Sequence, residues 1–373
     1  MKYYLIAGER SGDLHASNLI KSLKKQDASA DFRALGGEMM EAAGSKIYRY
    51  YHEINYMGVW EVIKNLKIIL KNLKACKEDI LAHRPDVLIL VDFGGFNIKM
   101  AKFAKEQNIK TFYYISPKVW AWNTGRAYKI KKYVDRMFVI LPFEKEFFKQ
   151  FDYEVDYVGN PVNDSITAFV SDKNMDSFFH YLKKPIVAIL PGSRKYEVQN
   201  MFSVIGEVVN KNRAYSYVVA AVDSLPKHYY EDFKKQYPHV EILYEKTYDI
   251  LVHSQAAVVT SGTASLETAL LNVPHMVVFK ANWFSYLVAM SVLKIKYVSL
   301  PNLIAGYEVV KELLQYQFTP KIVSNNLNQL LNNENTRNAQ LAGYSKIKNI
   351  LGEAGTADKT AKLMYGYLRN MNI

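Results

Sequence analysis

The chain has 373 residues, of which 49% are hydrophobic and 23% charged, so it can form two ordinary domains and is not a disordered chain. Its formal net charge of +12 favours an anionic partner, a phosphorylated substrate or an acidic membrane surface; without a nucleic-acid-binding motif, nucleic acid is not expected. The single Cys76 excludes an internal disulfide, and we expect neither a signal peptide nor a membrane span.

The first half of the chain alternates between short apolar runs and helical patterns, which is typical of a parallel sheet covered by helices. The apolar runs predict strands at residues 2–7, 31–35, 86–91, 110–115, 135–141 and 153–158. Helices are expected from the first turn to about residue 26, at residues 39–43, 59–83 and 98–107, and from Pro142 onward.

A polar turn follows the first strand and carries Glu9, Ser11, Gly12, Asp13 and His15. It lacks the G-x-G-x-x-G spacing, so we expect no nicotinamide or flavin site there. Because it lies at the carboxyl end of a parallel strand, its acids are candidates for ligand binding. The alternative is a helix start that Ser11 or Asp13 caps, with solvated acids.

Asp92 is the best candidate for a catalytic base in the first half, since it follows a buried strand and precedes a Gly-Gly turn. The alternative is a helix cap, for which Asn97 is better placed. After the next strand, Trp120 and Trp122 flank Ala121 in a loop. They are either core side chains or a platform for a sugar or acyl chain. Residues 126–132 are predicted to form a basic turn.

The helix predicted at residues 59–83 has two stripes at helical spacing. The apolar stripe is Ile63, Leu66, Leu70 and Leu73, and the lysine stripe is Lys64, Lys67, Lys71 and Lys74. The pattern fits either an ordinary amphipathic helix with solvated lysines or a helix lying on an anionic membrane surface.

Residues 165–184 are polar and without clear pattern, and we interpret them as a domain boundary. The second half again alternates, with strands predicted at residues 186–190, 215–221, 240–244, 256–260 and 275–279. Three helical patterns follow Asn302. The last of them, at residues 356–371, is expected to pack back on the first half.

Two small-residue turns of the second half open helices directly after predicted strands. The first contains Gly192, Ser193 and Arg194, and the second contains Ser261, Gly262 and Thr263, with Glu267 one turn further. Helix N-termini and an arginine suit the phosphates of a nucleotide diphosphate, and Glu267 would accept hydrogen bonds from ribose hydroxyls. The alternative is that such turns occur in any parallel α/β domain.

The predicted fold class is therefore α/β, with two Rossmann-like domains facing a cleft, which is the GT-B arrangement of nucleotide-sugar glycosyltransferases. The sequence contains no Asp-x-Asp pair, so we expect no metal and no cofactor. Helix N-termini and Arg194 would stabilise the leaving diphosphate, and a base from the first half would take the proton of the acceptor hydroxyl.

The motifs, taken in order across the whole chain, resemble those of the lipid-A-disaccharide synthase family. The first half contributes Ala7-Gly8-Glu9, Ser11-Gly12-Asp13-Leu14-His15, Gly36-Gly37, Met57-Gly58, Glu61-Val62, Asp92, Phe96-Asn97, Ser116-Pro117, Trp120-Ala121-Trp122, Leu141-Pro142-Phe143-Glu144 and Val158-Gly159. The second half contributes Leu190-Pro191-Gly192-Ser193-Arg194, Ser261-Gly262-Thr263, Glu267, Leu300-Pro301-Asn302, Glu312 and Gln315.

The resemblance implies transfer of 2,3-diacylglucosamine from its UDP donor to 2,3-diacylglucosamine 1-phosphate, giving a β-1,6-linked disaccharide and UDP. It implies a cytoplasmic protein, peripheral on the inner membrane of a Gram-negative cell. Residues 1–165 would bind the acceptor and the membrane, residues 166–345 the nucleotide sugar, and residues 346–373 would return to the first domain. The implied catalytic residues are Asp92, Glu9 and Arg194, and the implied substrate-binding residues include Asn302, Glu312 and Gln315. The oligomeric state and the choice of base among Asp92, Glu9 and Asp13 stay open.

Three positions depart from the family pattern: Gly95 replaces a frequent second Asp, Asn160 a frequent His, and Arg10 a small residue. A second carboxylate at position 95 therefore cannot be essential here, and we assign no acid–base role to Asn160. One alternative function is a GT-B transferase or epimerase that uses soluble UDP-N-acetylglucosamine, which would not need the Trp loop or the basic helix. Another is a nucleotide-sugar-binding or membrane-associated module without turnover, which would not need Asp92, Glu9 and Arg194.

Overall fold

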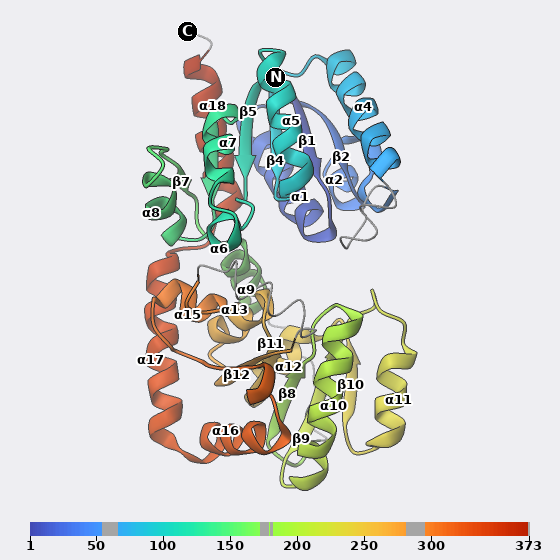
Figure 1. Ribbon diagram of the computed structural model, residues 1–373, viewed down its shortest axis with the longest axis vertical. Helices are drawn as coiled ribbons and strands as arrows, with labels where there is room; N and C mark the ends of the chain where they lie inside the picture. Colours follow the sequence, from blue (N-terminus) through green and yellow to red (C-terminus); the bar gives the residue numbers. More distant parts are fainter. Residues whose placement is uncertain (54–65, 172–178, 180–181, 281–294, 372–373) are drawn as a thin grey trace. The chain divides into compact units, whose positions relative to one another are not determined.

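A computed structural model describes residues 1–53, 66–171, 179, 182–280 and 295–371 of the chain (Figure 1). The chain divides into two compact units. Unit 1 comprises Met1–Pro161 together with Glu353–Ile373, and unit 2 comprises Val162–Gly352. Each unit contains its own parallel sheet with helices on both faces, as predicted, and each is described by itself.

The sheet of unit 1 has the strand order β3-β2-β1-β4-β5-β6-β7, and all neighbouring strands are parallel. Its strands are β1 (Lys2–Ala7), β2 (Asp31–Gly36), β3 (Lys46–Tyr50), β4 (Val87–Val91), β5 (Lys110–Tyr114), β6 (Arg136–Val139) and β7 (Asp156–Tyr157). Along the chain, β2 and β3 are added on one side of β1, and β5, β6 and β7 are later added on the other side of β4. The carboxyl ends of β1 and β4 therefore form a topological switch point, where open α/β sheets bind ligands.

Helices cover both faces of this sheet because alternate residues of the central strands are buried on opposite sides. Tyr3 and Leu5 of β1 pack with α1 and α18, whereas Tyr4 and Ile6 pack with α4 and α5. The described helical segments of unit 1 are α1 (Arg10–Gln26), α2 (Glu38–Ala42), η1 (Tyr51–Glu53), α4 (Leu66–His83), α5 (Gly94–Glu106), α6 (Val119–Trp122), α7 (Arg126–Tyr133), α8 (Phe143–Lys149) and α18 (Thr356–Met371).

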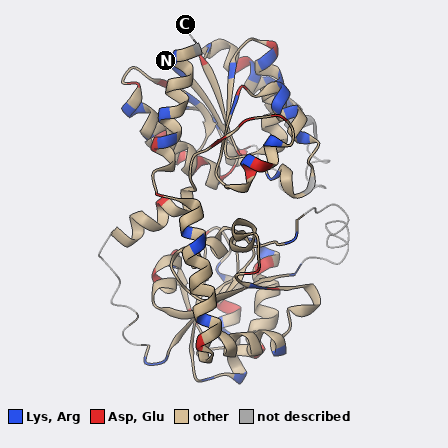
Figure 2. Cartoon of the chain, turned by 90° about the vertical axis from the view of Figure 1, so that its left-hand side faces the viewer, with Lys and Arg blue, Asp and Glu red and all other residues tan. Residues whose placement is uncertain are grey.

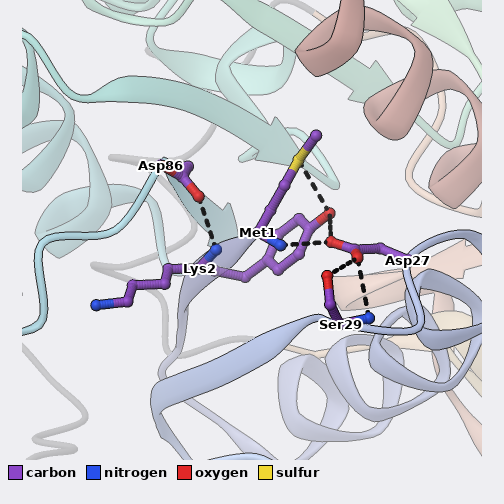
Figure 3. Close-up of polar contacts among 6 residues, drawn as sticks. Met1, Lys2, Asp27, Ser29 and Asp86 are labelled. Atoms are coloured by element: carbon purple, nitrogen blue, oxygen red, sulfur yellow. Dashed lines mark hydrogen bonds and ion pairs between the residues drawn. The ribbon is translucent and has the colours of Figure 1, made fainter.

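The start of β1 is held by three polar contacts (Figure 3). The amino group of Met1 pairs with the Asp27 carboxylate at 2.8 Å, and the Tyr3 hydroxyl donates to the same oxygen at 3.2 Å. The backbone N–H of Lys2 donates to the Asp86 carboxylate at 2.8 Å. These contacts connect β1 to the end of α1 and to the residue before β4, so they help to fix the two strands that form the switch point.

The sheet of unit 2 has the order β10-β9-β8-β11-β12-β13 and is also parallel throughout, with its switch point between β8 and β11. Its strands are β8 (Ile186–Leu190), β9 (Ser216–Ala221), β10 (Glu241–Tyr244), β11 (Ser254–Thr260), β12 (His275–Phe279) and β13 (Lys311–Leu314). Its described helical segments are α9 (Pro161–Ser171), α10 (Lys195–Lys211), α11 (His228–Gln236), α12 (Thr247–Val252), α13 (Thr263–Leu270), α15 (Leu300–Ala305), η3 (Gln315–Gln317), α16 (Pro320–Asn332) and α17 (Glu334–Leu351).

Two strands were not predicted, and both lie at an outer edge of a sheet. β3 has the sequence KIYRY, and β13 has the sequence KELL in a region for which only helices were expected. An edge strand is paired on one side only and tolerates charged residues, so it lacks the uniform apolar run of a central strand.

Two expectations about helices were wrong for a related reason. Residues 126–133 form α7 rather than a basic turn, because Ala127 and Ile130 are buried three residues apart while the lysines face outward. The segment interpreted as a patternless boundary begins inside α9, which runs to Ser171. Residues 172–178 and 180–181 of that segment lie outside the described part.

The C-terminal helix α18 packs against α1 within unit 1, where Ala361, Met364 and Leu368 join the core beside β1. The preceding helix α17 belongs to unit 2 and continues to Leu351, beyond residue 346, where we expected the returning segment to begin. Among the described helices, none combines the length and the apolar character needed to cross a membrane.

Candidate active site

The switch point of unit 1 brings two candidate carboxylates together. β1 and β4 are neighbours with Ala7 opposite Val91, Glu9 lies two residues after Ala7, and Asp92 directly follows Val91. Glu9 is the N-cap residue of α1, and its carboxylate accepts a hydrogen bond from the Ser11 hydroxyl at 2.8 Å. The fold therefore places Glu9 and Asp92 at the edge of the sheet where ligands bind.

The backbone at Asp92 has an unusual conformation that its neighbours hold in place. Asp92 and Phe93 both have φ 46°, in the left-handed region that non-glycine residues seldom occupy. The Asn97 side-chain amide donates to the Asp92 carbonyl at 2.8 Å, and the Tyr113 hydroxyl donates to the same carbonyl. The Phe93 ring covers Gly8, where a Cβ atom would lie 2.3 Å from the ring. Asn97 therefore supports the turn from inside α5 and does not cap this helix, which was the alternative considered for it.

The surroundings of Asp92 raise the pKa of its carboxyl to about 6. Burial is the largest cause, followed by the charge of Glu9, while Lys118 and the Phe93 N–H lower the pKa. A carboxyl with this pKa is still mostly ionised at neutral pH and binds a proton more tightly than an ordinary aspartate. These are the properties required of a general base near pH 7.

Asp13 has a different environment from Asp92. Its buried carboxylate accepts hydrogen bonds from the backbone N–H groups of Gly37 (2.9 Å), Met39 (3.1 Å) and Met40 (3.1 Å). It therefore caps α2. The alternative that Ser11 or Asp13 caps α1 is not met, since no side chain caps that helix. Gly12 is buried beside it, and Ser11 is exposed.

The segment after β5, where Trp120 lies in the short helix α6 and not in the expected loop, is anchored inside unit 1 by Glu144. The indole N–H of Trp120 donates to Glu144 at 3.1 Å, its ring packs edge-on against Phe143, and the Leu141 N–H donates to the second carboxylate oxygen at 3.0 Å. Trp120 is only 8% exposed, which agrees with the core interpretation of its side chain. Burial raises the pKa of Glu144 to about 7. The side chain of Trp122 lies outside the described residues.

In unit 2, the turn after β8 is built around the Glu197 carboxylate. Ser193 N–H and Arg194 N–H both donate to Glu197 Oε2 at 3.2 Å, and Arg194 Nη1 donates to Oε1 at 3.3 Å. Gly192 has φ +95°, and a Cβ atom there would lie 2.3 Å from Glu197 Oε2. Two N–H groups that we expected to be free for a phosphate are therefore used within the chain, whereas the Arg194 side chain is largely exposed.

The turn after β11 leads into α13 and lies at the same switch point, because Val259 pairs with Leu190. The Ser261 hydroxyl donates to the Val298 carbonyl at 3.1 Å, Gly262 is the N-cap residue, and Thr263 is exposed. Glu267 accepts a hydrogen bond from the Tyr248 hydroxyl at 2.8 Å, and burial raises its pKa.

Asn302 and Glu312 belong to one hydrogen-bonded cluster. Glu312 accepts from Val298 N–H (3.0 Å), Ser299 N–H (3.0 Å) and the Asn302 amide (2.8 Å), which holds the segment just before α15. The side-chain oxygen Oδ1 of Asn302 in turn accepts from Val309 N–H and Val310 N–H. The cluster connects the loop before α15 to β13. Ser261 also contacts this loop. Gln315 lies just beyond β13, is buried and has φ 51°.

The described part of the lysine-bearing helix α4 buries only part of the predicted apolar stripe, together with residues outside it. Leu73, Cys76 and Ile80 are buried, whereas Leu70 is 53% exposed. Lys71 and Lys74 are exposed, but Ile63 and Lys64 and the side chains of Leu66 and Lys67 lie outside the described residues. Residues 57–62 of the motif set do so as well.

A groove of about 450 Å³ runs between α4 and α5. Its lining combines apolar and positively charged side chains. The Lys77 ammonium lies 5.0 Å from the centre of the Phe103 ring, and Lys74 and Lys102 have Glu78 and Glu106 as ion-pair partners. Lys and Arg are spread over the outer helices of unit 1 (Figure 2). The lining residues are Leu70, Leu73, Lys74, Lys77, Lys99, Lys102, Phe103 and Glu106.

Sequence reasoning did not identify four residues that the structure places beside the candidate site residues: Lys118, Glu144, Glu197 and Tyr248. Glu197 had a signal, since a Glu three residues after the N-cap position is the pattern of a capping box. Glu144 was indicated only by its membership of the motif set. Tyr248 and Lys118 are far in sequence from their partners, and only the strand order brings them together. No group of three or more metal-binding side chains is found in the ranges that the structure describes.

Comparison with known proteins gives one consistent result. The family model described as lipid-A-disaccharide synthetase matches residues 3–363. The lipid-A-disaccharide synthase of Syntrophus aciditrophicus is 34% identical over 96% of this chain and 95% of its own length. That of Coxiella burnetii is 30% identical over 98% of both chains.

Two solved structures show the same fold at low sequence identity. The UDP-GlcNAc 2-epimerase of Neisseria meningitidis bound to UDP-GlcNAc has a TM-score of 0.63 at 14% identity, over 99% of this chain and all of its own. The calicheamicin glycosyltransferase CalG4 has a TM-score of 0.62 at 14% identity, over 99% of this chain and 98% of its own. The fold is thus shared with epimerases and transferases, and the whole-chain matches show that this protein belongs to the lipid-A-disaccharide synthase family of glycosyltransferases.

Proposed function

We propose that this protein transfers 2,3-diacylglucosamine from UDP-2,3-diacylglucosamine to 2,3-diacylglucosamine 1-phosphate, forming the β-1,6-linked disaccharide of lipid A and UDP. The family match over residues 3–363 carries this proposal. In the reaction, an acceptor hydroxyl oxygen forms a bond to the anomeric carbon while the bond from that carbon to the diphosphate breaks. The hydroxyl proton goes to a base, and UDP leaves with the bonding electrons.

Asp92 is the proposed base. Its carboxyl has a pKa of about 6, lies at the unit 1 switch point and is held in a fixed backbone geometry. Burial raises that pKa most, and the charge of Glu9 raises it further, because a second negative charge nearby disfavours ionisation. Asp13 is the weaker candidate, since its oxygens already accept three backbone N–H groups.

Unit 2 is proposed to bind the UDP part of the donor. Arg194 carries an exposed guanidinium at the start of α10, where the helix dipole also favours an anion. Charge develops on the diphosphate as it leaves, so these groups stabilise the transition state without a metal ion. The displacement inverts the anomeric centre. Glu267, beside Tyr248, is proposed to accept from the ribose hydroxyls.

Unit 1 is proposed to contact the anionic cytoplasmic face of the inner membrane through α4 and α5. Both substrates carry acyl chains, so the protein has to reach lipids at a bilayer surface. The groove between these helices offers lysines for phosphates and Leu70, Leu73 and Phe103 for apolar groups.

A direct assay tests the reaction. The purified full chain is incubated with both lipid substrates in excess chelator, and UDP and disaccharide are quantified. We expect both products in equal amounts. Turnover of UDP-N-acetylglucosamine with no product from the lipid pair would contradict the proposed reaction. Activity that disappears with chelator and returns with Mg²⁺ would contradict the metal-free mechanism.

A further inference from the structure

Glu197 interacts with the turn and the arginine that the proposed function assigns to the leaving diphosphate. One of its carboxylate oxygens accepts the N–H groups of Ser193 and Arg194 at 3.2 Å. The other accepts from Arg194 Nη1 at 3.3 Å and from the Tyr196 hydroxyl at 3.2 Å. A single side chain therefore contacts both the backbone of the turn and the guanidinium.

The two partners of this ion pair differ in exposure. The side chain of Glu197 is 8% exposed, whereas that of Arg194 is 61% exposed. The carboxylate is fixed by burial and by the backbone N–H groups, and Gly192 leaves no Cβ to displace it. The guanidinium contacts Glu197 through Nη1 and also contacts the Tyr196 side chain, while most of the arginine side chain stays exposed. Such an arrangement restricts where the guanidinium can lie while keeping it accessible to a ligand.

The contacts also separate the hydrogen-bond donors of this turn into those used within the chain and those still available to a ligand. N–H groups that point at a buried carboxylate are not free for an external phosphate. An anion at this turn would therefore meet the guanidinium first. A long, exposed arginine without a fixed partner would sample many rotamers, and only some of them would suit the leaving diphosphate.

We propose that Glu197 is a positioning residue that acts through Arg194, holding the guanidinium where charge develops on the leaving diphosphate. The proposal rests on the proposed function of Arg194 and adds a residue that does not itself touch substrate. It differs from a purely structural role as a helix cap, in which Glu197 would affect folding and Arg194 would act independently of it.

A double-mutant cycle separates these roles. The full-length variants Glu197→Ala, Arg194→Ala and the double variant are assayed for kcat and for the donor KM. We expect Glu197→Ala to lower kcat about tenfold or more when Arg194 is present, and less than about twofold when Arg194 is absent. Coupling of this kind shows that one residue acts through the other. An equal loss in both backgrounds would overturn the proposal.

Two further variants keep the test decisive. Glu197→Gln removes the charge that holds Nη1 but leaves an oxygen to accept from the turn, so it tests the coupling if Glu197→Ala does not fold. Glu207→Ala, which removes an exposed partner of Lys211 on the same helix, should leave kcat unchanged. If Arg194→Ala itself keeps the wild-type kcat, the proposed function of Arg194 fails. If Arg194→Ala is impaired but Glu197 is uncoupled from it, only the present inference fails.

Discussion

The two units have sheets of the same kind, yet their switch points carry opposite chemistry. In unit 1 the turns after β1 and β4 bear Glu9 and Asp92, and their mutual repulsion helps to raise the pKa of Asp92. In unit 2 the turns after β8 and β11 bear small residues, helix N-termini and Arg194. The fold specifies where a ligand can bind, and the residues after the strands determine whether that place offers carboxylates or cationic groups.

The largest expected effect comes from removing the carboxylate at the unit 1 switch point. Asp92→Asn keeps the size and the backbone contacts but removes the base, so kcat should fall by about 10²–10⁴-fold. Single-turnover measurements at saturating substrates, with circular dichroism to check folding, provide the test. A kcat within threefold of wild type would assign the base elsewhere, first to Glu9.

Arg194→Ala removes the cation at the unit 2 switch point. It should lower kcat by roughly 10²–10³-fold, since the guanidinium opposes charge that grows only in the transition state. Steady-state kinetics at saturating donor measure it. Arg213→Ala, an exposed arginine just beyond α10, is the matched control and should behave as wild type. A rise in the donor KM with an unchanged kcat would show ground-state binding instead.

Membrane binding should depend on unit 1 and not on unit 2. Lys77→Gln together with Lys99→Gln should weaken binding to vesicles rich in anionic lipid by about 30-fold, because each lysine near such a surface contributes about 1 kcal/mol. The matched pair Lys235→Gln and Lys321→Gln, exposed in unit 2, should change little. Equal sedimentation of all three proteins with the vesicles would exclude the groove as the contact.

The smallest expected change refines the donor side. Glu267→Gln should raise the donor KM by about tenfold and leave kcat nearly unchanged, because a ribose contact is equally strong in ground and transition states. Tyr248→Phe removes the hydroxyl that contacts Glu267 and serves as the companion variant. An unchanged donor KM in Glu267→Gln would indicate a packing role.

The central architecture was predictable from the sequence because both sheets are parallel and their inner strands are uniformly apolar. The runs at residues 86–91 and 186–190 indicated buried strands, and β4 and β8 lie there. The positions of Asp92 and Arg194 followed directly from those strand ends. The edge strands β3 and β13 could not be found in this way, since their charged residues interrupt the pattern.

Side-chain partnerships were the least predictable part of the site. Asp13 and Asp92 both belong to turns at the switch point, yet Asp13 caps α2 through three backbone N–H groups whereas Asp92 is held beside Glu9. Glu197 shows the same difficulty, because a local capping pattern does not reveal that the carboxylate also holds an arginine. Such contacts depend on rotamers and on residues distant in sequence.

The coupling between Glu9 and Asp92 is the central claim, and the pH dependence of kcat/KM in Glu9→Gln tests it most directly. If Asp92 is the base, activity requires its ionised form and should fall as the pH drops through the pKa of that carboxyl, about 6 in the wild type. Removing the charge of Glu9 lowers that pKa, and the acid limb should move to lower pH. Ionisation of the substrates is the same for both proteins and cancels in the comparison. An acid limb at the same pH in both proteins would contradict the account.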